Sequence, residues 1–153
     1  MNYWLMKSEP SVYSIGDLKR DGQTLWDGVR NYQARNFLKQ MAIGDLAFFY
    51  HSNSQPPGIV GLMTIIDSQV IDPTQFDPQS DYYDPKSSRE NPRWHTVKTQ
   101  FKEEFTQILT LETLKDRFSP DELLVVKKGN RLSVMPIAPD VAQKILQEMS
   151  TTV

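Results

Sequence analysis

Residues 46–66, LAFFYHSNSQPPGIVGLMTII, hold two apolar segments separated by a polar loop. The segments at residues 46–51 and 59–66 are rich in aromatic and β-branched side chains, which favour extended chain. The loop between them, SNSQPPG, contains adjacent prolines and a glycine, and such residues end strands. The pattern therefore predicts two neighbouring strands of one sheet.

The chain on either side of this pair shows both strand and helix patterns. Alternation of apolar and polar residues predicts strands at residues 3–7, 94–101, 105–111 and 131–136. Apolar residues spaced three and four apart, with turn residues at the ends, predict helices at residues 14–19, 31–41, 114–118, 120–126 and 140–149. Because strands and helices are mixed without regular βαβ units, we expect an α+β fold around a mostly antiparallel, curled sheet.

The composition indicates one folded domain. The chain has 153 residues, of which 39% are hydrophobic and 24% charged. Its 3 Trp, 6 Tyr and 7 Phe residues supply enough burial to exclude disorder of the whole chain. We therefore expect a single domain over residues 1–153. Cysteine is absent, which excludes disulfides, a thiolate nucleophile and cysteine-based metal sites.

The sequence shows no targeting or membrane-spanning segment. Its apolar start is only a few residues long, and no apolar run approaches the roughly 20 residues that cross a bilayer. We expect a cytoplasmic protein, or a nuclear one in a eukaryote, that has no membrane partner and is a monomer or weak homodimer. Neither histidine lies in a spacing typical of a metal site, and no cofactor-binding loop is present, so neither metal nor cofactor is expected.

The acidic charge of the chain is concentrated in its middle. The net charge is −2, yet residues 54–90 alone carry 6 acidic and 2 basic groups. Within this part the Asp-Pro pair occurs three times, and each proline disfavours helix. We interpret residues 72–92 as a long acidic surface loop. A flexible linker between two domains is the alternative.

Two predicted strands end in polar side chains. At the end of the first strand, Lys7 and Ser8 could meet an anion at a pocket mouth, although a surface lysine beside a turn serine is the alternative. The strand at residues 46–51 ends in an aromatic residue and a polar run, a combination typical of a pocket with apolar walls and a polar rim. The candidate residues there are Tyr50, His51, Ser52 and Asn53.

The start of the predicted helix at residues 31–41 is basic and polar. No carboxylate occurs between residues 28 and 38, whereas a solvated helix face usually carries Glu–Lys pairs. Arginine and asparagine near a helix start suit phosphate contacts and hydrogen bonds to base edges. The candidates are Trp26, Arg30, Asn31, Tyr32 and Arg35. A solvated polar face is the alternative.

The predicted strand at residues 131–136 has two candidate residues on one face. Alternation places Arg131 and Ser133 opposite the apolar Leu132 and Val134. The polar pair could therefore line a cleft. An edge strand with polar outer residues explains the pattern equally well.

Several of these stretches make the sequence resemble the EVE domain family, which includes the thymocyte nuclear protein family. The matching stretches are residues 4–10, WDGVRNYQARNFL at 26–38, FYHSN at 49–53, residues 58–61 and RLSVMP at 131–136. EVE domains belong to the PUA-like superfamily, so the resemblance implies a curled β-barrel flanked by helices. It also implies recognition of nucleic acid, with a modified base such as a methylated or hydroxymethylated cytosine held in a pocket.

We therefore hypothesise that the protein binds modified DNA or RNA and flips one base into this pocket. The aromatic residues expected to stack on the base are Trp26 and Tyr50. The residues expected to read its edge are Asn31, Ser52, Asn53 and Ser133. The residues expected to hold flanking phosphates are Lys7, Arg30, Arg35 and Arg131.

Two other functions are consistent with the same residues. The protein could be an enzyme acting on nucleic acid, with His51 or Lys7 as the acid–base group. It could also be a small-ligand or protein-interaction module that docks a partner through the Asp-Pro loop.

Overall fold

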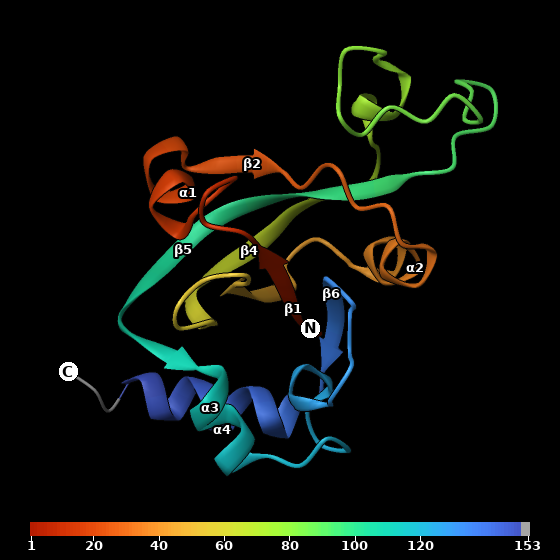
Figure 1. Ribbon diagram of the computed structural model, residues 1–153. Coiled ribbons are helices and arrows are strands. Elements are labelled where there is room, and N and C mark those ends of the chain that lie inside the picture. The colour runs from red at the N-terminus through yellow and green to blue at the C-terminus, as the bar shows by residue number, and fades with distance from the viewer. Residues whose placement is uncertain (151–153) are drawn as a thin grey trace.

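The computed structural model describes residues 1–150 as a mixed sheet with helices packed on it (Figure 1). The strands are β1 (Tyr3–Ser8), β2 (Gln23–Leu25), β3 (Leu46–His51), β4 (Gly58–Ile71), β5 (His95–Thr110) and β6 (Val134–Ile137). The α-helices are α1 (Ile15–Asp21), α2 (Tyr32–Gln40), α3 (Leu111–Arg117) and α4 (Pro139–Ser150). Two short 3-10 helices are η1 (Pro73–Phe76) and η2 (Leu124–Val126).

The six strands form one sheet in the order β2-β5-β4-β3-β1-β6. Strands β1 and β3 are parallel, and every other neighbouring pair is antiparallel. The predicted α+β fold with a mostly antiparallel sheet is therefore confirmed. The sheet curls strongly through the long β4–β5 ribbon, as Figure 1 shows. Since β2 and β6 lie at its two edges among the described residues, the sheet is open, and "barrel" describes it only loosely.

Each face of the sheet buries its own hydrophobic cluster. Along β1, Tyr3 and Leu5 pack into one cluster with α3 and α4, whereas Trp4 and Met6 pack into the other with α1 and α2. This division follows from the two-residue period of a strand, and the sequence predicts it. In Figure 1, α3 and α4 lie together at the bottom, whereas α1 lies at the upper left and α2 at the right.

Two glycines allow β4 to approach β5 closely. A Cβ atom on Gly58 would lie 2.4 Å from the Leu109 carbonyl oxygen, and one on Gly61 would lie 2.4 Å from that of Glu103. No side chain larger than hydrogen fits at such distances. These two glycines therefore permit the close packing of β4 on β5.

The longest strands extend beyond the predicted bounds. Residues 94–101 and 105–111 are predicted as two strands, but one strand, β5, runs through both. The polar residues between them mark an irregularity in the pairing with β4, where the register shifts between Leu62 and Met63, rather than an end. Strand β4 likewise continues to Ile71. The sequence analysis misses β2, whose three residues are too few to show a period.

Two predicted elements near the C-terminus are wrong or displaced. Within residues 120–126, only Leu124–Val126 are helical, and they form the short 3-10 helix η2. The strand predicted from residue 131 begins at Val134 instead. The Asn130 side chain causes this delay, because its amide donates to the Leu124 carbonyl at 2.7 Å and its oxygen accepts from the Leu132 N–H at 2.9 Å.

The acidic loop at residues 72–92 is held against the sheet by the buried side chain of Gln75. Its amide nitrogen donates to the carbonyls of Asp72 and Trp94, and its oxygen accepts hydrogen bonds from the Ser87 hydroxyl and from the Trp94 N–H. The Trp94 indole N–H also donates to Asp84 at 2.7 Å. The loop therefore has a specific folded conformation next to β5, which Figure 1 shows at the upper right.

Candidate functional site

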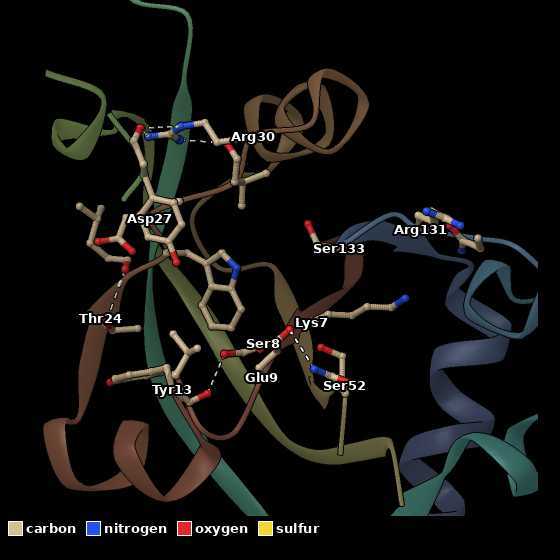
Figure 2. A pocket seen from close by; sticks show the side chains of 18 residues that line it. Lys7, Ser8, Glu9, Tyr13, Thr24, Asp27, Arg30, Ser52, Arg131 and Ser133 are labelled. Carbon is tan, nitrogen blue, oxygen red and sulfur yellow. Dashed lines mark hydrogen bonds between the residues drawn. The ribbon is translucent and has the colours of Figure 1, made fainter. Parts of the chain in front are cut away.

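A cavity with a volume of about 1250 Å³ lies where β1 and β3 end (Figure 2). Eight of the predicted site residues line it, namely Lys7, Ser8, Trp26, Arg30, Ser52, Asn53, Arg131 and Ser133. The other lining residues are Glu9, Val12, Tyr13, Thr24, Leu25, Asp27, Gly28, Val29, Tyr82 and Asn130. The structure therefore brings together residues from five separate parts of the chain.

Backbone pairing explains why three of these parts meet. Strands β1 and β3 are parallel, with Ser8 opposite His51, so the polar residues that follow both strands emerge at the same edge. The Ser52 N–H donates to the Ser8 carbonyl at 3.0 Å. The Lys7 N–H donates to the Ser133 carbonyl at 2.8 Å, which joins the segment before β6 to the same edge.

One side of the cavity is basic. The Lys7 ammonium lies 5.6 Å from the centre of the Tyr50 ring, and burial lowers the pKa of Lys7. Arg131 is exposed, and Figure 2 shows both side chains on the same side of the cavity. Within residues 1–150, no carboxylate forms an ion pair with either group. Both cations are therefore available to an anionic ligand.

The opposite side of the cavity carries Asp27 (Figure 2). Desolvation and the nearby charge of Asp72 raise the pKa of Asp27, and Arg30 only partly offsets these two effects. Its carboxylate is solvent-accessible, and no other residue in the described part of the chain donates a hydrogen bond to it. The neighbouring Trp26 lines the cavity and packs edge-on against Phe49, with ring centres 5.4 Å apart.

The acidic loop contributes Tyr82 to the cavity. A Cβ atom on Gly28 would lie 2.6 Å from the Tyr82 ring, so the ring rests directly on the Gly28 backbone. Gly28 also has a φ of 84°, a conformation that favours glycine. Neither Asp27 nor Tyr82 is predicted from the sequence, because Asp27-Gly28 has the pattern of an ordinary turn and Tyr82 lies in the acidic loop, far along the chain from the other lining residues.

Arg30 joins the turn after β2 to the acidic loop. Its guanidinium donates to the Tyr82 carbonyl at 2.7 Å, to the Thr74 hydroxyl at 3.0 Å and to the Asp72 carboxylate at 3.1 Å. Burial alone would raise the pKa of Asp72, but hydrogen bonds from Thr74, Gly28 and Arg30 outweigh it and lower this pKa. Arg30 lines the cavity, yet its hydrogen bonds are made to protein.

Three residues predicted at the start of α2 lie outside the cavity lining. Asn31 caps the helix, since its side chain accepts from the Ala34 N–H at 2.9 Å. The Tyr32 ring stacks on Trp94 at 4.9 Å between centres, and the Arg35 guanidinium lies 4.8 Å from the centre of the Tyr32 ring. These contacts fasten α2 to the chain preceding β5. A role in nucleic-acid contact stays a prediction for all three.

Tyr50 and His51 also lie outside the cavity lining. The Tyr50 ring is buried in the cluster that includes residues of α3 and α4, and burial raises its pKa to about 12. His51 accepts a hydrogen bond from the Ile15 N–H at 3.1 Å through Nε2, which satisfies a free amide at the start of α1. Burial lowers the pKa of His51, which favours the neutral ring that this contact requires.

Comparison with known families matches the EVE domain model to residues 2–148. The chain belongs to the EVE domain family. Among curated EVE relatives, Thymocyte nuclear protein 1 of Mus musculus is 42% identical over 163 residues, which covers 95% of this chain and 72% of that protein. The resemblance inferred from the sequence motifs is thereby confirmed.

Solved structures show the same EVE fold. A protein from Pseudomonas syringae is 48% identical, with a TM-score of 0.92 over 96% of this chain and 99% of that chain. Human THYN1 protein, solved in complex with 5-methylcytosine-containing DNA, is 40% identical, with a TM-score of 0.90 over 97% of this chain and 98% of that chain.

Two kinds of feature are absent from residues 1–150 of this EVE domain. No helix there has both the length and the apolar character that crossing a membrane requires. No three His, Asp or Glu side chains in the same range are grouped so that they could hold a metal ion.

Proposed function

We propose that this EVE domain binds nucleic acid and holds a modified base, such as 5-methylcytosine, in the cavity of Figure 2. The observation that carries the proposal is the close similarity to human THYN1 protein, whose structure contains 5-methylcytosine DNA. The cavity supports it, because about 1250 Å³ exceeds the roughly 300–1,000 Å³ of most small-ligand pockets. It therefore has room for a base together with part of its sugar and phosphate.

The lining residues supply the interactions that a flipped base needs. Extrusion of a base from the stack costs a few kcal/mol, and stacking on an aromatic ring returns ~1–3 kcal/mol. Trp26 offers such a ring, held in place by its edge contact with Phe49. Lys7 and Arg131 are free to hold the phosphates beside the base. Ser52 and Ser133 also line the cavity, and their hydroxyl groups are the candidates for hydrogen bonds to the edge of the base.

The expected preference for methylation is modest. Burial of one methyl group is worth ~0.8 kcal/mol, which corresponds to about a fourfold change in affinity. A larger preference requires the cavity to exclude water from the methyl group and to match its shape. The assay must therefore resolve a difference of fourfold.

Fluorescence anisotropy with matched oligonucleotides tests the proposal. The oligonucleotides carry one central cytosine or 5-methylcytosine, in single- and double-stranded form. We expect the wild-type chain to bind the methylated form at least about fourfold more tightly. Lys7→Gln should weaken binding to both forms, whereas the matched control Lys19→Gln, an exposed lysine on α1 outside the cavity, should not. Equal binding to both bases by the wild-type chain would refute the proposal.

We further propose that the domain binds without catalysis. The only histidine near the cavity uses its acceptor nitrogen to bind the Ile15 N–H, so it would have to give up this bond to act as a base. Incubation of the modified and unmodified oligonucleotides with wild type and His51→Ala tests this. Turnover by the wild type that disappears in the variant would identify an enzyme instead.

A further inference from the structure

The charged groups of the cavity lining are unevenly placed, with Glu9 also in the lining and Arg30 bonded to the acidic loop. Lys7 and Arg131 lie on one side, and Asp27 lies on the other, as Figure 2 shows. The two ends of a nucleotide also differ, because its phosphate is anionic whereas the amino edge of its base presents hydrogen-bond donors. A nucleotide bound with its phosphate against these two cations would present its base toward Asp27.

Asp27 has no other evident task in the fold. Its carboxylate receives no hydrogen bond from another residue in the described part of the chain. Asp72, by contrast, accepts bonds from Gly28, Arg30 and Thr74. Desolvation and the charge of Asp72 both disfavour the ionised form of Asp27. A carboxylate that lines the cavity, has a raised pKa and is unpaired within residues 1–150 is a candidate to bond to the ligand.

We infer that Asp27 determines base specificity by accepting a hydrogen bond from the exocyclic amino group of the bound base. The inference rests on the proposed function and names the class of base: a cytosine-type base with an amino group, and not thymine or uracil. Asp27 directly follows Trp26 in the chain, and both residues line the cavity.

The sharpest comparison is between 5-methylcytosine and thymine. Both bases carry a methyl group at position 5, so burial of the methyl group cannot distinguish them. They differ at position 4, where cytosine presents an amino donor and thymine presents a carbonyl acceptor. An ionised carboxylate can only accept, so it binds the first and repels the second.

The test measures affinity for oligonucleotides that differ in one base. The central base is cytosine, 5-methylcytosine or thymine, and the proteins are wild type, Asp27→Asn and Asp27→Glu at pH 8. Asp67→Asn, at an exposed aspartate of β4 outside the cavity, is the matched control. Thermal unfolding of each variant checks that it is folded.

We expect the wild type and Asp67→Asn to prefer 5-methylcytosine over thymine by at least about tenfold. In Asp27→Asn the ratio should fall to within about threefold, because an amide can rotate to donate to the thymine carbonyl. An unchanged ratio in Asp27→Asn would overturn the inference but leave the proposed function intact. A wild type that does not prefer 5-methylcytosine over cytosine would instead refute the proposed function, and the inference with it.

Discussion

Arg30 illustrates how a residue with a plausible functional pattern can serve the fold. The sequence presents it as a phosphate ligand beside other basic residues. In the structure its guanidinium bonds to Asp72, Thr74 and the Tyr82 carbonyl, all of which belong to the acidic loop. The Asp72 side chain is only 2% exposed, so this ion pair is largely shielded from solvent. Arg30 therefore shapes the cavity by positioning the loop.

This ion pair leads to a prediction about stability. Asp72→Asn removes the charge that Arg30 faces, and we expect the free energy of unfolding to fall by about 2 kcal/mol at pH 7. Urea denaturation measures this value. Arg20→Ala is the control, because it breaks only exposed ion pairs with Asp17 and Asp21 and should change stability very little. A loss no larger than that of the control would contradict the prediction.

The difference between wild type and Asp72→Asn should also depend on pH. The folded protein lowers the pKa of Asp72 from its ordinary value of 3.8. The stabilisation is therefore fully present above pH 3.8 and is lost as the pH falls through the lower folded pKa. Denaturation at a series of pH values should show the two stabilities converging in acid.

We expect Asp27→Asn to change the stability of the protein in the opposite direction from Asp72→Asn. The folded protein raises the pKa of Asp27, so its ionised form opposes folding. We expect the variant to be more stable than the wild type at pH 7 and the gain to vanish below the ordinary carboxyl pKa of 3.8. Thermal unfolding at pH 7 and in acid measures the gain in stability and its loss. A variant less stable than the wild type at pH 7 would show that Asp27 has a structural partner.

At the scale of elements, the parallel pair β1–β3 forms one edge of the cavity. Strand β1 is predicted from its alternation and β3 from its continuous apolar, aromatic-rich segment, and the polar residues after each strand are predicted as pocket candidates. Their proximity depends on the register that places Ser8 opposite His51. Alternation shows which face of a strand is buried but carries no information about its neighbour. The sequence therefore predicts the two strand ends but not their side-by-side placement.

Limited proteolysis can test whether the acidic loop is held in one folded conformation. Gln75→Ala removes the side chain that bonds to Asp72, Ser87 and Trp94, and it should leave residues 72–92 open to proteolysis. The wild-type loop should resist limited digestion, as should Gln79→Ala, which alters an exposed residue of the same loop. Mass spectrometry of the fragments locates the cuts. Rapid cleavage of the wild type between residues 72 and 92 would indicate a flexible linker instead.

At the scale of the whole molecule, the distribution of charge matters more than its total. The net charge of −2 is unusual for a nucleic-acid-binding protein, but the acidic excess lies in residues 54–90. The cavity offers two unpaired cations, Lys7 and Arg131, rather than a broad basic face. Binding should therefore depend on a few local contacts around one nucleotide.

Salt dependence measures the number of those contacts. With two to three phosphates neutralised, we expect a plot of log affinity against log salt concentration to have a slope of about −2 to −3. Arg131→Gln should reduce the slope by about 1 and weaken binding to modified and unmodified strands equally. Arg117→Gln, which alters an arginine of α3 that is paired with Glu148 and does not line the cavity, is the control. A slope steeper than about −5 would indicate a broad electrostatic footprint instead.

The sequence by itself determined the α+β class, the division of β1 between two cores, the buried faces of the helices and the polar strand ends. These features depend on hydrophobic periods of two and 3.6 residues. Such periods can be recognised in the sequence because they involve residues close together in the chain. Only the tertiary structure decided that Arg30 binds the acidic loop, that Tyr82 returns to rest on Gly28, and that Asp27 faces Lys7 across one cavity. Such contacts join residues far apart in the chain, and they are selected by strand register and close packing, which no local period encodes.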